Sequence, residues 1–140
     1  MAGKTLSRST PGLPDAEKIT VNLGFVDLGQ IDLLVKEGFY SNRTDFIRSA
    51  IRQQLMHHGD AVRQVVARNT FTLGLKSYSR AELEALQDSG VQVHIRGLGL
   101  TCIAPDVTPE LARATIASLV VLGSLNASPA VKAALADRLR

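Results

Sequence analysis

The chain has no tryptophan, few aromatic side chains (4%) and a single cysteine, Cys102. One cysteine cannot form an internal disulfide, and this usage is typical of a reducing compartment such as the cytoplasm. The longest hydrophobic run, residues 116–123, is far shorter than the roughly 20 residues that a membrane-spanning helix needs. The amino terminus also lacks the apolar segment of a signal peptide. We therefore expect a soluble, cytoplasmic protein without a membrane partner.

No charge of one sign dominates the sequence. The 16 basic and 13 acidic side chains give a net charge of +3, which is too small to indicate nucleic-acid binding by itself. Within residues 17–58 the basic and acidic side chains balance. If this part of the chain binds DNA, the position of its charges must matter more than their number.

The sequence also lacks the motifs of common catalytic and metal sites. We find no phosphate-binding loop, no zinc-ligand pattern and no nucleophile elbow. His57 and His58 are adjacent, so on a helix they point about 100° apart and do not chelate one ion together. Cys102 lies in a mostly apolar stretch and is expected to be buried. We predict no enzymatic activity, no metal and no cofactor.

A short alternating segment opens the ordered part of the sequence. Ile19, Val21 and Leu23 are apolar and alternate with Lys18, Thr20 and Asn22, which are polar. A period of two predicts a strand with one buried and one exposed face. One strand followed by two short helices cannot close a core alone, so we expect two copies of the chain to pair their strands.

Two amphipathic helices are predicted after this strand. Asp27 and Gln30 form a capping-box pattern that places the start of the first helix near Leu28. Gly38 is a typical residue at a helix end. Asn42 and Asp45 form the same pattern for a second helix that ends near residue 57. A third short helix is predicted over residues 60–68, where valines recur at helical spacing.

Residues 17–58 resemble the ribbon-helix-helix proteins of the MetJ/Arc/CopG superfamily, most nearly the CopG-like branch. The strand over 18–23 and the run over 40–48 carry this resemblance; the latter reads Tyr-Ser-Asn-Arg-Thr-Asp-Phe-Ile-Arg. The resemblance implies an intertwined α+β homodimer, in which two strands form an antiparallel ribbon that enters the major groove of double-stranded DNA. A sequence-specific transcriptional regulator, and a repressor in particular, is the function it implies.

The resemblance also implies which side chains contact DNA. Lys18, Thr20 and Asn22 project from the outer face of the ribbon and would contact bases. The start of the second helix would contact the phosphate backbone through Ser41, Asn42, Arg43 and Thr44. One departure concerns the turn after the strand: the usual member has a proline and acidic residues there, whereas this chain has Gly24-Phe25-Val26.

The second half of the sequence repeats a strand–loop–helix pattern three times. The predicted strands hold Gly74, Gly97 and Gly123, which are 23 and 26 residues apart. The three units are residues 71–86, 93–116 and 120–135, with strands expected over 71–75, 93–98 and 120–125. Each helix is expected to begin at a serine or threonine cap: Ser79, Thr108 or Ser128. This order predicts a βαβαβα fold with a parallel sheet, either as a leucine-rich-repeat-like solenoid or as a compact three-stranded layer.

We predict four parts: a flexible arm (1–16), a ribbon-helix-helix DNA-binding domain (17–58), a linker helix (59–69) and a β/α repeat domain (70–140). The repeat domain would serve oligomerisation beyond the homodimer or bind a protein partner. Two alternatives remain at this point. The protein could be an antitoxin that represses its own operon, or an assembly protein that acts through exposed sheet edges of the repeats.

Overall fold

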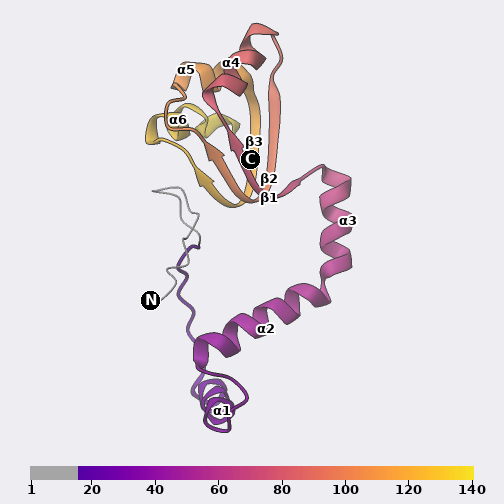
Figure 1. Cartoon of the computed structure of the whole chain (residues 1–140), viewed down its shortest axis with the longest axis vertical. Helices are drawn as coiled ribbons and strands as arrows, with labels where there is room; N and C mark the ends of the chain where they lie inside the picture. Colours follow the sequence, from indigo (N-terminus) through magenta and orange to yellow (C-terminus); the bar gives the residue numbers. More distant parts are fainter. Residues whose placement is uncertain (1–15) are drawn as a thin grey trace, which may run out of the picture. The chain divides into compact units, whose positions relative to one another are not determined.

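A computed structural model describes residues 16–140, so the predicted arm lies outside the described residues except for its last one. Two compact units make up the described chain (Figure 1): the N-terminal unit ends at Ala61, and the C-terminal unit runs from Val62 to Arg140. The elements in order are α1 (Phe25–Lys36), α2 (Arg43–His57), α3 (Gly59–Asn69), β1 (Thr72–Tyr78), α4 (Arg80–Asp88), β2 (Val93–Ile103), α5 (Pro109–Thr115), β3 (Ile116–Asn126), α6 (Pro129–Ala134) and the 3₁₀-helix η1 (Ala136–Arg138).

Helix α1 begins earlier than the sequence predicted. We expected a capping box of Asp27 and Gln30 to start it near Leu28. Instead α1 begins at Phe25 with Gly24 as the N-cap, and no side chain caps it. Because Gly24 is extended (φ −64°, ψ 152°), its carbonyl oxygen accepts the Leu28 N–H at 3.0 Å. Asp27 therefore lies inside the first turn, where its negative charge favours the positive end of the helix dipole.

The end of α1 follows the prediction at Gly38. This glycine has a φ of +86°, a left-handed conformation that costs a residue with a Cβ about 1–2 kcal/mol. The Gly38 N–H donates to the Val35 carbonyl at 3.1 Å, and the Phe39 N–H donates to the Leu34 carbonyl at 2.9 Å. These two bonds are the Schellman motif, which satisfies carbonyl groups that the helix leaves unpaired.

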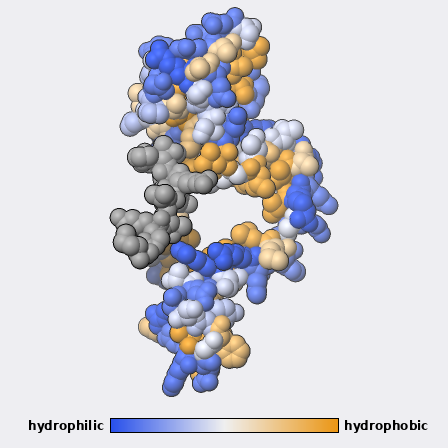
Figure 2. Space-filling view, in the orientation of Figure 1, coloured by the Kyte–Doolittle hydropathy of each residue, from blue (hydrophilic) through white to orange (hydrophobic). Residues whose placement is uncertain are grey.

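The N-terminal unit has almost no core of its own. Ile31 is its one buried side chain among residues 16–61, and α2 buries none. Ile47, Ile51 and Leu55 are four residues apart, so they share one face of α2, and all three are exposed. Figure 2 shows part of the apolar surface over α2 and α3. The large apolar side chains of this unit are therefore mostly exposed in a single copy.

The C-terminal unit confirms the predicted alternation of strands and helices. Its three strands form one parallel sheet in the order β1-β2-β3. The helices α4, α5 and α6 gather on one side of the strands (Figure 1), and their apolar side chains share one core with the sheet. Whether the repeats form a true solenoid stays a prediction.

The helices α4, α5 and α6 each begin at a predicted cap. Ser79, Thr108 and Ser128 are the N-caps, and each side-chain oxygen accepts an N–H from the first turn. Proline follows at the first position of α5 and α6, where no N–H is needed. Thr101 and Thr115 are buried in this unit, but its hydrophobic core is a single cluster of apolar side chains. It consists of Leu83, Ile95, Ile103, Val107, Leu111, Ala112, Ile116, Leu119, Val131 and Leu135.

All three strands are longer than predicted, and the difference is largest for β2 and β3. β2 continues through residues 100–103, where Cys102 is buried as expected and has a free thiol. β3 begins at Ile116, which the sequence pattern had placed in the preceding helix. The backbone of Ile116 is extended (φ −105°, ψ 105°), and its side chain is fully buried in the core. An apolar residue after a short helix fits either element, so periodicity alone did not separate them.

The structure corrects the alignment of the repeat glycines. Gly99, not Gly97, is the register partner of Gly74 on one side and of Gly123 on the other. All three have positive φ: 105° for Gly74, 129° for Gly99 and 119° for Gly123. A Cβ on Gly97 would lie 2.2 Å from the Thr101 Oγ1, whereas residues four apart in a straight strand are roughly 13 Å apart. The strand β2 therefore bends sharply at Gly99.

We expect Gly99→Ala to destabilise the C-terminal unit. An alanine Cβ would lie 2.4 Å from the backbone oxygen of Gly74, and the φ of +129° would strain it further. The conformational strain alone costs about 1–3 kcal/mol. Gly29→Ala is the matched control, because this helical glycine has nothing within 4 Å of a built Cβ and its change should be neutral or stabilising by about 1 kcal/mol. Thermal unfolding of both variants measures the difference, and equal melting temperatures would contradict the bend.

The described residues contain no helix that is long and apolar enough to cross a membrane.

Candidate nucleic-acid interface

The candidate base-contacting residues lie before α1, in the segment over 18–23 where the sequence predicted a strand; in a single copy this segment forms neither a helix nor a strand. Lys18, Thr20 and Asn22 are all exposed. Within residues 16–140 no strand pairs with this segment, so its backbone N–H and C=O groups are open to a partner. Its apolar side chains are open as well: Ile19 is 73% exposed and Val21 is 66% exposed. Polar and apolar side chains alternate along this segment and all are exposed, which is the pattern expected of a strand before it pairs with a neighbour.

The candidate phosphate-contacting residues lie together at the start of α2. Asn42 is the N-cap, and its Oδ1 accepts the Asp45 N–H at 2.8 Å, as the sequence predicted. The return bond differs from a capping box: the Asp45 carboxylate accepts the N–H of Ser41 at 2.9 Å rather than that of Asn42. Together the two bonds fix the path by which the chain enters α2.

This cap leaves part of the helix start open. Hydrogen bonds to other groups among residues 16–140 use the N–H groups of Ser41, Asp45 and Phe46, but not those of Arg43 and Thr44. Both residues are exposed. The positive end of the helix dipole adds to these two donors, so the start of α2 favours an anion such as a phosphate group.

An ion pair ties the start of α2 to α1. The Arg43 guanidinium holds the Asp32 carboxylate with two bonds, from Nε at 2.7 Å and from Nη2 at 2.8 Å. The hydrogen bond from Arg43 lowers the pKa of Asp32, and the same bond raises the pKa of Arg43. Both side chains are about half exposed, so the pair contributes more to orientation than to stability. A guanidinium has five N–H donors, so the Nη1 group of Arg43 is left for another acceptor.

The sequence did not single out Asp32. It lies on α1, and the turn between the two helices brings it to Arg43, which is eleven residues further along the chain. No helical spacing rule connects residues across such a turn, so only the structure could show the contact.

The structure therefore brings the four helix-start residues together and leaves the strand residues separate. No hydrogen bond or ion pair joins Lys18, Thr20 or Asn22 to Ser41, Asn42, Arg43 or Thr44 in the part of the chain that is described. His57 and His58 stack edge to face at 5.1 Å, and no cluster of three potential metal ligands occurs among residues 16–140.

Comparison with known proteins places these features in a family. One relative is an uncharacterised protein of Methanocaldococcus jannaschii, which is 44% identical over 39 residues. That match covers 28% of this chain and 40% of the relative, so the chain spans well under two thirds of the protein it matches. No solved structure matches. Residues 14–132 match the ribbon-helix-helix transcriptional regulator family, a range that includes both the candidate interface and all three strands of the C-terminal sheet. The chain belongs to the ribbon-helix-helix transcriptional regulator family.

Proposed function

We propose that this chain is a sequence-specific DNA-binding homodimer that represses transcription. Residues 17–58 form the DNA-binding domain, and the helix over 59–69 links it to the sheet domain over 70–140. The segment over 18–23 pairs with the same segment of a second copy, and the resulting antiparallel ribbon enters the major groove. The observation that carries the proposal is this unpaired segment, which exposes apolar side chains on one face and polar side chains on the other.

Dimerisation would provide the hydrophobic core that the N-terminal unit lacks in a single copy. In an antiparallel ribbon Ile19, Val21 and Leu23 face the helices, where they meet the exposed stripe of Ile47, Ile51 and Leu55. Each such side chain gains about 1.5–3 kcal/mol when it becomes fully buried. In the dimer these six side chains of each copy become buried, and they form the core that a single copy lacks.

The opposite face of the ribbon then carries the groups that read bases. Asn22 offers both a donor and an acceptor, which suits the paired N6 and N7 groups of adenine. Lys18 can donate to the acceptors of guanine, and the hydroxyl and methyl of Thr20 suit a neighbouring polar edge or a thymine methyl. A two-stranded ribbon is narrow enough for the major groove of B-DNA.

The start of α2 fixes the ribbon on the phosphate backbone. The N–H groups of Arg43 and Thr44 donate to a phosphate oxygen, and the side chains of Ser41 and Asn42 border the same position. The Nη1 group of Arg43 adds a charged donor while its other nitrogens keep the ion pair with Asp32. Contacts of this kind set the position of a protein on DNA and carry no sequence information.

The folded C-terminal unit bears on the antitoxin alternative. Antitoxins with this N-terminal motif usually hold a toxin through a short disordered tail, whereas residues 72–138 form a sheet and helices around a common core. A regulator whose sheet domain serves oligomerisation therefore has more support than an antitoxin.

Selection from a library of genomic DNA fragments at physiological salt tests the proposed function. Salt matters because non-specific phosphate binding weakens steeply as salt rises. We expect the purified protein to enrich a discrete inverted or direct repeat, whose spacing gives the geometry of the oligomer. Failure to enrich any site, with a folded dimer in the tube, would refute the proposal and favour an assembly role.

A further inference from the structure

The two edges of the C-terminal sheet differ in how far other residues of the chain cover them. The edge of β3 is partly closed by the last two residues: Leu139 pairs with Leu119 in a parallel bridge, and the Arg140 N–H donates to the Leu119 carbonyl at 2.9 Å. This finding corrects the expectation that both sheet edges are exposed.

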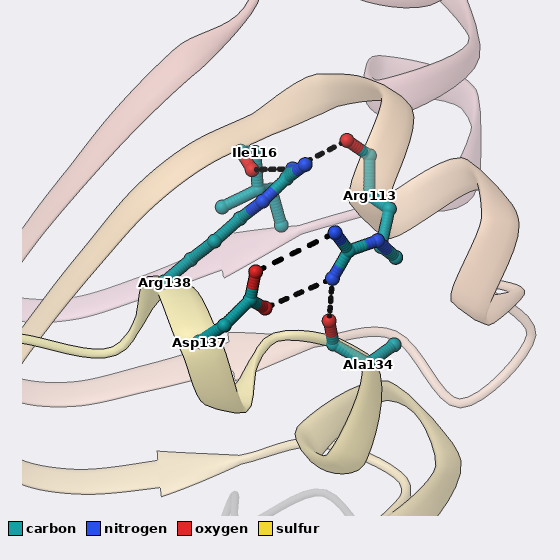
Figure 3. Close-up of polar contacts among 5 residues, drawn as sticks. All are labelled: Arg113, Ile116, Ala134, Asp137 and Arg138. Atoms are coloured by element: carbon teal, nitrogen blue, oxygen red, sulfur yellow. Dashed lines mark hydrogen bonds and ion pairs between the residues drawn. The ribbon is translucent and has the colours of Figure 1, made fainter.

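A network of arginines holds this closing segment in place (Figure 3). The Arg138 guanidinium donates to the carbonyl oxygens of Arg113 and Ile116, at the junction of α5 and β3. The Arg113 side chain donates in turn to the Ala134 carbonyl and forms an ion pair with Asp137 at 2.9 Å. Five contacts between α5, β3 and the end of the chain thus fix the cap on the β3 edge.

The edge of β1 has no such cap. Within the described residues, β1 pairs with β2 alone, so every second backbone N–H and C=O of its outer edge points away from the sheet. Leu73 is 68% exposed and Leu75 is 62% exposed, on either side of Gly74. The one charged residue of β1 is Lys76, and its Nζ lies over the ring of Tyr78, 5.2 Å from the ring centroid. The usual protections of an edge strand are therefore missing from residues 72–75.

We infer that the β1 edge binds the β1 edge of a second copy of this chain. A two-fold axis makes the two strands antiparallel, and the same residues then contribute to both sides of the interface. The three-stranded sheets of the two copies join into one continuous sheet, and Leu73 and Leu75 of each copy become covered by those of the other. This contact closes the sheet edge that residues 16–140 of a single copy leave open.

A second copy fits this edge better than an unrelated protein does, and this step rests on the proposed function. The N-terminal units already hold two copies together in the proposed dimer. Only the fourteen residues between His57 and Thr72, most of them in α3, separate α2 from β1. A tether this short raises the effective concentration of one β1 edge near the other to the millimolar range. A weak edge contact, which would not form between free molecules, can then form.

Hydrogen exchange of the full-length protein, followed by mass spectrometry, tests this interface. We expect the amides of β1 to exchange about tenfold more slowly in the wild type than in the double variant Leu73→Glu/Leu75→Glu, because carboxylates across the axis repel each other. Amides of β2 and β3 should be unchanged in the variant. Val91→Glu is the matched control, since Val91 is also exposed but lies outside the sheet, and it should keep the slow exchange of β1.

The outcomes separate this inference from the proposed function. Slow exchange of the outward-pointing β1 amides that is lost in the double variant supports the interface, whether or not the protein selects a DNA site. The mass of the assembly in solution then shows whether the edges pair within one dimer or between two. If the β1 amides of the wild type exchange as fast as those of an exposed loop, the edge is free and the inference is wrong. Slow exchange that requires the addition of another protein would also overturn it.

Discussion

Asn22→Ala should abolish recognition of the selected DNA site while leaving the dimer intact. A good bidentate contact between a side chain and a base contributes about 1–3 kcal/mol, and a two-fold dimer presents Asn22 twice. Two contacts together are about 2–6 kcal/mol, so the affinity for the selected site should fall by roughly thirtyfold to twenty-thousandfold. Binding to unrelated DNA at low salt should change little, because it depends on phosphate contacts. Fluorescence anisotropy with the selected and a scrambled duplex measures both affinities.

A lysine comparison accompanies this experiment. Lys18→Ala should relax the sequence preference if Lys18 contacts a base, or weaken all DNA binding and reduce the salt slope by about 1 if it contacts a phosphate. Lys36→Ala is the control of equal charge, because Lys36 is exposed in the last turn of α1, outside the proposed interface. If the Asn22→Ala dimer binds the selected site as tightly as the wild type, the ribbon does not read bases through this residue.

The sequence alone was sufficient to predict those features of the structure that depend on residues a few positions apart. Asn42 caps α2 as predicted because the Asp45 N–H is only three residues away. Gly38 ends α1 because few other residues adopt its backbone conformation. The N-caps of α4, α5 and α6 are further examples, since a hydroxyl and the first-turn N–H groups meet within one turn.

The predictions that were wrong depend on contacts between distant residues. Gly97 and Gly99 are both typical of a bend, and only the pairing with β1 and β3 selects Gly99. The start of α1 is an exception, because the contact involved is local: the Gly24 carbonyl accepts the Leu28 N–H, and the helix begins at Phe25 without a side-chain cap. The closure of the β3 edge by Leu139 and Arg140 left no periodic signal in the sequence.

The residues of the candidate site likewise differ in whether the sequence alone could place them. The helix-start residues could be located from the sequence because a cap is local, but the Asp32 partner of Arg43 could not. Lys18, Thr20 and Asn22 share one face by their period of two, and this follows from strand geometry alone. The strand that pairs with them is absent from a single copy, so their final arrangement depends on the proposed dimer.

Phe46→Ala should unfold the N-terminal unit and dissociate the dimer in one step. Phe46 is half-buried in a single copy and contacts the Tyr40 ring edge to face, with 5.0 Å between the ring centroids and 84° between the planes. Truncation of a core phenylalanine lowers the free energy of unfolding by about 3–5 kcal/mol. Because the proposed core is shared between two copies, this loss should appear as weaker association as well as lower stability.

Denaturant titrations at several protein concentrations, followed by hydrogen exchange of the α1 and α2 peptides, measure this loss apart from the C-terminal sheet. For the wild type we expect the midpoint of the unfolding transition of these helices to move to higher denaturant concentration as the protein concentration rises. This follows because dissociation accompanies unfolding. In the variant the same transition should move to lower denaturant at every concentration.

Phe25→Ala is the matched control, because Phe25 is 92% exposed at the start of α1 and its truncation should have a small effect. A transition that does not depend on protein concentration would mean that the N-terminal unit folds as a monomer. The intertwined dimer, and with it the paired ribbon, would then be wrong.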